Sequence, residues 1–300
     1  MRAAAYALIV ALLPAAGTRS EEGTHSCLPA ELRMRARFAD PEQLVRALNE
    51  VDSERKRSAK RDAVARRFRE AGCAAVEEQH GAGISEPNVV CRIAGKHERT
   101  IAIGSSPAFD GWASAALLPE IARAISSSER IHSYEIAMLS RSARESPSGA
   151  RLLRDSRSRE SWALFIHAGS LGFEKPLVSE ESDDLQSCAI RELAKTFGMQ
   201  VPRERGWDRL SIPCDFVRGN APTPISNCSG SSVTRMLDVH PFIRDEIPVL
   251  GLYAFPERDA MNFRKPRATR LDAEQYVHAF RLLAAYAVIA DQLLPLPGVP

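Results

Sequence analysis

The sequence has almost no net charge and few aromatic residues. Its 40 Lys and Arg are balanced by 38 Asp and Glu, which leaves a formal charge of +2, and aromatic residues make up 6%. So small an excess does not favour a nucleic acid or an anionic membrane surface as the partner. The basic clusters at 55–57 and 60–61 alternate with acidic residues in a predicted helix, which indicates a solvated face.

Long apolar runs are absent after residue 13, so we predict no transmembrane segment in the mature chain. No CxxC motif or Cys/His cluster is present, which argues against a structural zinc site. Met1-Arg2, the apolar run 3–13 and the small residues at 15–17 instead predict a signal peptide over 1–20. The protein would then be exported, either periplasmic or secreted.

Cysteine usage agrees with an oxidising compartment, because an even number permits three disulfides. The six cysteines are at positions 27, 73, 91, 188, 214 and 228. Cys73 and Cys91 fall in two strands that we expect to be neighbours, so we predict that they are bridged. Cys188, Cys214 and Cys228 would share one further bridge, or two with Cys27.

The remaining 280 residues read as a polar leader (21–39) and a single α/β domain (40–300). Short β-branched runs alternate with amphipathic helices. The strands at 73–77, 88–93 and 100–103 should form one edge of a mixed sheet, with 101–103 near its centre. Further strands are predicted at 134–139, 162–167 and 247–253. Helices are predicted at 40–51, 61–71, 111–125 and 183–195, with a last helix from Asp272.

The stretch 99–125 contains the most informative residue, Asp110. It lies between the carboxyl end of a predicted strand and the amino end of a predicted helix, where α/β proteins bind ligands and metals. The alternative interpretation is that Asp110 only caps the helix.

Three segments resemble the co-catalytic zinc aminopeptidases, a family that also contains glutamate carboxypeptidases and glutaminyl cyclases. The run DGWASAALLPEIARAI from Asp110 is similar to the family's Asp-led helix, and DVHPFIRDEIPVL from Asp238 is similar to its D-H-x-P-F-x-x-x-G-I-P-V-L segment. The strand NVVCRIAG from Asn88 is similar to N-V-I-A-x-I-x-G. The order of strands and helices, read with this resemblance, predicts a three-layer α/β/α fold with a mixed, mostly parallel central sheet.

The same resemblance makes Asp110 the carboxylate that bridges two metals, and it places unsuitable residues at the other ligand positions. Ala108 stands where the family has Asp. The further positions that lack a ligand or the general base are Ser106, Ser142, Ala143, Gly169 and Asn262. Glu145 is a weak candidate for the base if the loop shifts. Weak candidates for replacement ligands are His167, His240, Asp238 and Asp259.

Two-metal hydrolysis needs several anionic or imidazole ligands, and one carboxylate cannot hold the pair of ions. The sequence therefore predicts an exported, aminopeptidase-like pseudoenzyme without a cofactor, which binds a peptide or protein partner. The alternative is an active zinc aminopeptidase or glutaminyl cyclase with relocated ligands. A third class is a disulfide-stabilised assembly partner, and metal content separates the first two.

Overall fold

The computed structural model describes most of the chain between residues 37 and 294. The described residues are 27–28, 37–82, 84, 86–107, 112–140, 148–169, 171–172, 176–178, 182–201, 238–253 and 271–294. The predicted signal peptide lies outside them.

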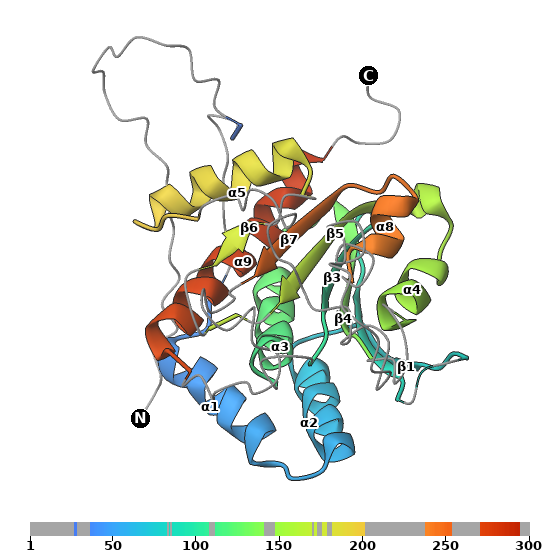
Figure 1. The fold of residues 1–300 in the computed structure, drawn as a ribbon, viewed down its shortest axis with the longest axis vertical. Helices are drawn as coiled ribbons and strands as arrows, with labels where there is room; N and C mark the ends of the chain where they lie inside the picture. Colours follow the sequence, from blue (N-terminus) through green and yellow to red (C-terminus); the bar gives the residue numbers. More distant parts are fainter. Residues whose placement is uncertain are drawn as a thin grey trace, which may run out of the picture.

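The described elements form three layers around one sheet (Figure 1). In chain order they are α1 (Pro41–Ser53), α2 (Arg57–Glu70), β1 (Ala75–Gln79), β2 (Asn88–Ile93), β3 (His97–Ser105), α3 (Ala113–Ser126), β4 (His132–Met138), α4 (Ser148–Asp155), η1 (Arg159–Ser161), β5 (Trp162–Gly169), β6 (Leu177–Val178), α5 (Asp184–Thr196), α8 (His240–Arg244), β7 (Val249–Tyr253) and α9 (Ala273–Leu293). The predicted three-layer α/β fold is confirmed.

The sheet formed by the described residues has seven strands in the order β1-β2-β4-β3-β5-β7-β6. The four central strands β4, β3, β5 and β7 run parallel, while β1, β2 and β6 pair antiparallel at the two sides. All eight residues of β5 are buried, as expected for a parallel strand covered on both faces. Residues 101–103 lie in β3, the middle strand, as predicted.

One prediction about the sheet is wrong. The sequence predicted 73–77, 88–93 and 100–103 as three adjacent strands, but β4 lies between β2 and β3. A charged cross-strand pair holds β2 against β4, because Arg92 faces Glu135 in register and its Nε lies 3.1 Å from the carboxylate. Arg157 also donates to Glu135, at 2.8 Å.

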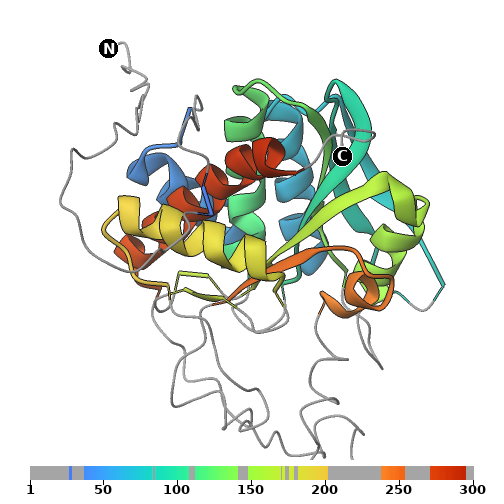
Figure 2. The same cartoon turned by 90° about the horizontal axis from the view of Figure 1, so that it is seen from above.

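Helices α1, α2, α3, α5 and α9 cover one face of the sheet, and the shorter α4 and α8 cover the other (Figures 1 and 2). The larger core lies under the five helices, and a smaller one, built around Trp162, Phe165 and Phe242, lies under α4 and α8. Phe165 of β5 stacks on Phe242 of α8 with ring centroids 3.9 Å apart. The sheet therefore has a larger hydrophobic core on one face than on the other.

At α1 and α9 the N-cap residues are the ones that the sequence predicts. The side chain of Asp40 accepts from Gln43 N, and that of Asp272 accepts from Glu274 N and Gln275 N. Helix α3 differs, because its N-cap is Trp112, without a capping side chain. Asp110, which the sequence offers as a cap of this helix, lies outside the described residues, so that interpretation stays untested.

Helix α9 packs along α3 and α5 (Figure 2) and is buried on nearly every side. Near its end, Asp291 accepts from the backbone amides of Ile131 and His132, both at 2.6 Å, where β4 begins. The hydroxyl of Tyr134 donates to Ala287 O at 2.8 Å. The sequence predicted one apolar stripe here, but the helix is embedded among its neighbours.

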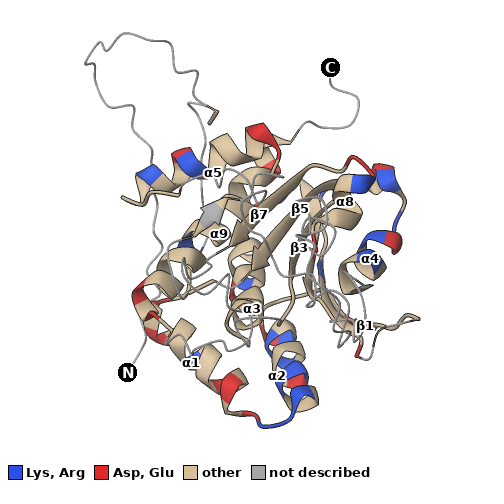
Figure 3. Ribbon diagram, viewed as in Figure 1, with Lys and Arg blue, Asp and Glu red and all other residues tan. Residues whose placement is uncertain are grey.

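Helix α2 is rich in basic residues (Figure 3), and several of them pair with acidic side chains. Lys60 lies 2.6 Å from Asp52, and Arg67 lies 2.6 Å from both Glu50 and the fully buried Glu120. Burial lowers the pKa of Arg67, but the hydrogen bonds and charges of Glu120 and Glu50 outweigh it and raise that pKa. These pairs tie α1, α2 and α3 together.

Two disulfides join described cysteines, Cys73–Cys91 and Cys27–Cys188. The first confirms the predicted pairing of neighbouring strands, with Cα atoms 5.5 Å apart. The second brings Cys27 of the predicted leader onto α5. Cys214 and Cys228 lie outside the described residues. No described helix combines the length and apolarity needed to cross a membrane.

Candidate functional site

Three side chains meet beyond the carboxyl ends of β3 and β5, the place where parallel α/β sheets usually bind ligands. They are Ser106, His167 and Asp238, which we call the sheet-edge cluster. Ser106 follows β3, His167 lies near the end of β5, and Asp238 precedes α8. The sequence had assigned Ser106 to a lost ligand position and the other two to replacement ligands.

Glycines lie beside His167 on both neighbouring strands. The strand register places Gly104 of β3 on one side of His167 and Gly251 of β7 on the other. His167 shares a sheet face with Phe165, because side chains two residues apart in a strand point the same way. That is the face covered by α8. The side chain of His167 is 6% exposed.

Asp238 is the centre of the sheet-edge cluster. Its Oδ2 accepts the hydroxyl of Ser106 at 2.6 Å and lies 3.1 Å from His167 Nε2. A carboxylate can only accept, so this contact assigns the ring proton of His167 to Nε2. His167 Nδ1 is buried and has no hydrogen-bond partner among the described residues. Both contacts end on the same oxygen, Oδ2.

The order of these groups differs from that of a serine hydrolase. There the imidazole lies between hydroxyl and carboxylate, so that it can take the hydroxyl proton. In the sheet-edge cluster the carboxylate lies between the other two, and Nε2 of His167 points to the carboxylate. His167 is thus not placed to activate Ser106 as a nucleophile.

Gly169 has no space for a side chain. A Cβ atom at this position would come within 2.5 Å of the ring of Tyr253 and 3.1 Å of His167 Cε1. Tyr253 is paired in register with Gly169, and its ring centroid lies 5.1 Å from that of His167. The aromatic ring therefore fills the space that a ligand side chain at Gly169 would need.

Asn88 fixes both ends of the segment 141–147, which precedes α4. Its Oδ1 accepts from Ser140 N at 2.7 Å, and its Nδ2 donates to Gly149 O at 2.9 Å. A Cβ atom on Gly149 would lie 2.4 Å from Ser140 O, so the two ends approach as closely as glycine allows. The family-like strand NVVCRIAG thus contributes a structural asparagine.

The other predicted site residues separate into two groups. His240 is half-buried as the first residue of α8, two residues after Asp238. The predictions for Asp110, Ser142, Ala143, Glu145, Asp259 and Asn262 lie outside the described residues.

The described part of the sheet edge does not fit a zinc ion. A catalytic zinc takes three protein ligands, and a two-metal site takes more. His167 and Asp238 are two ligand-type side chains, Ser106 is neutral, and Gly169 has no room for a carboxylate. Across the described residues, the one group of three Cys, His, Asp or Glu ligands within 4.8 Å is Cys27, Cys188 and Glu192, away from this edge.

Sequence reasoning missed Tyr253 and the flanking glycines. Gly251 and Tyr253 alternate on the predicted strand 247–253, as His167 and Gly169 do on the neighbouring one. Period-two alternation was the available signal, because it places all four on one face. What it could not give is the register that brings Tyr253 beside Gly169.

The comparisons with known proteins agree with this architecture. No family model matches the sequence, and no curated protein matches it. Solved structures do. An Acidobacteriales bacterium glutaminyl cyclase superposes with a TM-score of 0.61 at 13% identity, covering 92% of this chain and 99% of that one. The LapA aminopeptidase of Legionella pneumophila gives 0.59 at 15% identity, with 84% and 71% covered.

A leucine aminopeptidase precursor from Bacteroides thetaiotaomicron gives a TM-score of 0.55 at 12% identity, covering 85% of this chain and 99% of that one. The chain has the fold of zinc aminopeptidases and glutaminyl cyclases. At such identities the similarity concerns the aminopeptidase-like fold and does not extend to the residues of the site.

Proposed function

We propose that this protein is an exported, catalytically inactive member of the aminopeptidase-like fold, and that it binds a peptide or protein segment at the sheet edge. The observation that carries the proposal is the sheet-edge cluster. Ser106 and His167 both contact Oδ2 of Asp238, in an order that does not activate a nucleophile. Two disulfides are compatible with export.

The filled space at Gly169 supports the loss of metal chemistry. A side chain there would come within 2.5 Å of the ring of Tyr253, so a carboxylate at this position would require that ring to move. Binding at this edge is supported by its position beyond parallel strands. The side chain of Asp238 is 14% exposed, so a bound molecule can reach its negative charge. A basic group, such as a peptide amine or a Lys side chain, is the chemistry that this charge favours.

The second candidate is an active zinc aminopeptidase or glutaminyl cyclase with relocated ligands, and one observation favours it. His167 and Asp238 lie within contact distance, as two ligands of one metal would. Asp110, His240 and Asp259 would have to complete that set.

Metal analysis of the purified protein tests the two candidates, together with aminopeptidase and glutaminyl cyclase assays with added zinc and with a chelator. We expect less than about one tenth of an equivalent of zinc and no turnover. Near-stoichiometric zinc that is lost in Asp110→Ala, or turnover blocked by the chelator, would establish the enzyme instead.

Binding is tested with a library of fluorescent peptides that vary in charge at the amino terminus. We expect hits whose affinity falls at least tenfold in Asp238→Asn and is unchanged in Asp245→Asn, a carboxylate of the turn after α8. Hits that respond equally to both substitutions would place binding elsewhere. No hits, with concentration-dependent self-association, would favour an assembly role.

A further inference from the structure

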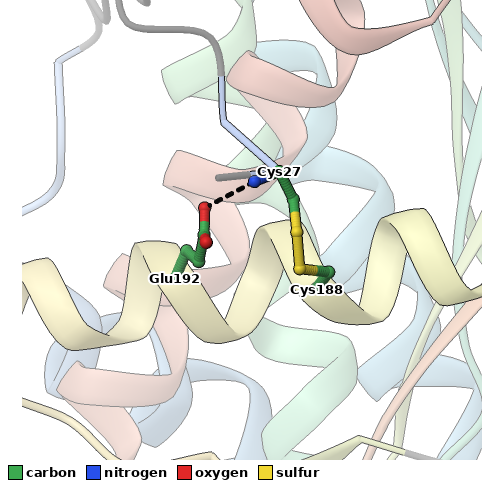
Figure 4. A group of neighbouring side chains, drawn as sticks. All are labelled: Cys27, Cys188 and Glu192. Atoms are coloured by element: carbon green, nitrogen blue, oxygen red, sulfur yellow. Dashed lines mark hydrogen bonds between the residues drawn. A yellow bond between two sulfur atoms is a disulfide. The ribbon is translucent and has the colours of Figure 1, made fainter. Parts of the chain in front are cut away.

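A second group of ligand-type side chains lies on α5, on the other side of the molecule's main core from α2. Cys27, Cys188 and Glu192 have their two sulfurs and a carboxylate oxygen within 4.8 Å of one another (Figure 4). All three residues are half-buried. The two cysteines form a disulfide, and nothing in the proposed binding at the sheet edge uses this group.

Helix geometry aligns two of the three ligands. Cys188 and Glu192 are four residues apart on α5, so they lie on one face of the helix, one turn from each other. Their side chains keep this arrangement whether or not Cys188 is bridged.

Hydrogen bonds hold the third ligand at the same place. The backbone amides of Cys27 and Leu28 donate to Glu192 Oε2 at 3.0 and 3.1 Å (the first is drawn in Figure 4). Leu28 also packs against the main core. Because reduction of the disulfide breaks none of these contacts, the two thiols should stay adjacent and close to the carboxylate.

We propose that the reduced form of this group is a zinc site. Two molecules of a small thiol supply two electrons and two protons and are oxidised to their own disulfide, while the S–S bond breaks and both sulfurs become thiols. Zinc then binds the two thiolates and the Glu192 carboxylate, which releases those two protons, and water takes the fourth position. Thiolates select zinc over magnesium or calcium, which prefer oxygen ligands.

Zinc also offsets the charge of its own ligands. Once both thiols have lost their protons, two thiolates would stand beside the Glu192 carboxylate and repel it, and a dication neutralises most of that charge. The ion would also keep Cys27 and the leader attached to α5 in reducing surroundings, where the disulfide is lost. The same three residues thus provide a disulfide cross-link when oxidised and a metal cross-link when reduced.

Cobalt titration of the full-length chain tests the proposal, because Co²⁺ bound to thiolate gives a charge-transfer absorption band. After reduction with a phosphine, one equivalent of Co²⁺ should produce the band and Zn²⁺ should displace it. The oxidised protein should give none. Absence of the band in a chain whose Cys27 and Cys188 alkylate fully would overturn the proposal.

Matched variants assign the band to this group. Cys27→Ser should abolish it, while Cys73→Ser, which removes an equal number of thiols, should keep it. Glu192→Gln should weaken Co²⁺ binding at least tenfold, and Asp184→Asn on the same helix should not. Equal losses in the two cysteine variants would assign the band to an unfolded chain and overturn the site. Asp238→Asn should leave the titration unchanged, which separates this site from the proposed function.

Discussion

The contact between Ser106 and Asp238 allows a quantitative test of the sheet-edge cluster. Ser106→Ala removes a donor 2.6 Å from a carboxylate whose side chain is 14% exposed. Hydrogen bonds to charged groups contribute about 1.5–3 kcal/mol, and partial exposure favours the lower end. We expect Ser106→Ala to lower the free energy of unfolding by about 1.5 kcal/mol.

Asp238→Ala removes both contacts of the carboxylate and leaves the imidazole of His167, 6% exposed, without this partner. We expect a loss of about 3 kcal/mol, the sum of two such hydrogen bonds. In the double variant the Ser106 contact is already absent, so the coupling energy of the cycle should be about 1.5 kcal/mol.

Urea unfolding with intact disulfides measures these values, provided that the slope with denaturant stays constant. A coupling energy under about 0.5 kcal/mol, the usual error of additivity, would show that the contact adds no stability. A chelator provides the second test. If it destabilises the wild type and not Asp238→Ala, a bound metal holds the carboxylate and the explanation by hydrogen bonds is refuted.

Three further predictions concern the scaffold. Glu120→Gln should cost about 3 kcal/mol, because it leaves the buried Arg67 without a fully buried anion, whereas Arg66→Ala, with a side chain 51% exposed, should cost under about 1 kcal/mol in the same urea assay. Removing the Cys73–Cys91 bridge, which spans 18 residues, should lower the unfolding midpoint by the equivalent of about 3 kcal/mol, and an unchanged midpoint would contradict the chain-entropy reasoning. Burial raises the pKa of Tyr286 well above its usual value near 10, so its contribution is complete below pH 10 and is lost as pH rises further. Phenolate absorbance should therefore appear together with loss of circular dichroism, with a smaller amplitude in Tyr286→Phe.

The sequence predicted those parts of the fold whose local pattern is compatible with one kind of structure. Apolar strands such as β5, capped helices such as α1 and α9, and the Cys73–Cys91 bridge all follow from periodicity and nearest neighbours. The position of β4 did not follow. Strand order depends on pairs such as Arg92–Glu135, 43 residues apart, and a pattern within one strand holds no information about its partner.

The sequence predicted which residues belong to the candidate site, but it did not predict which of them contact one another. The sequence singled out Ser106, His167 and Asp238 separately, each as a metal position that was lost or replaced. The contact between Ser106 and Asp238 joins residues 132 positions apart, and that between His167 and Asp238 joins residues 71 apart. These distances in sequence are closed by the packing of α8 on β5, which no local pattern specifies. The predictions for Asp110, Glu145, Asp259 and Asn262 remain predictions.

The embedding of α9 also has a consequence for the time course of synthesis. Its residues 273–293 leave the ribosome after every other described element, yet they bond to the start of β4 and fill the space between α3 and α5. At 5–20 residues per second, about 8–30 s separate the completion of β4 from that of α9. Until α9 is complete, α9 does not cover the part of α3 that it contacts in the folded protein, nor that of α5 once α5 has been synthesised. A chain stalled before residue 273 would therefore be a substrate for chaperones or proteases, even though its sheet sequence is complete.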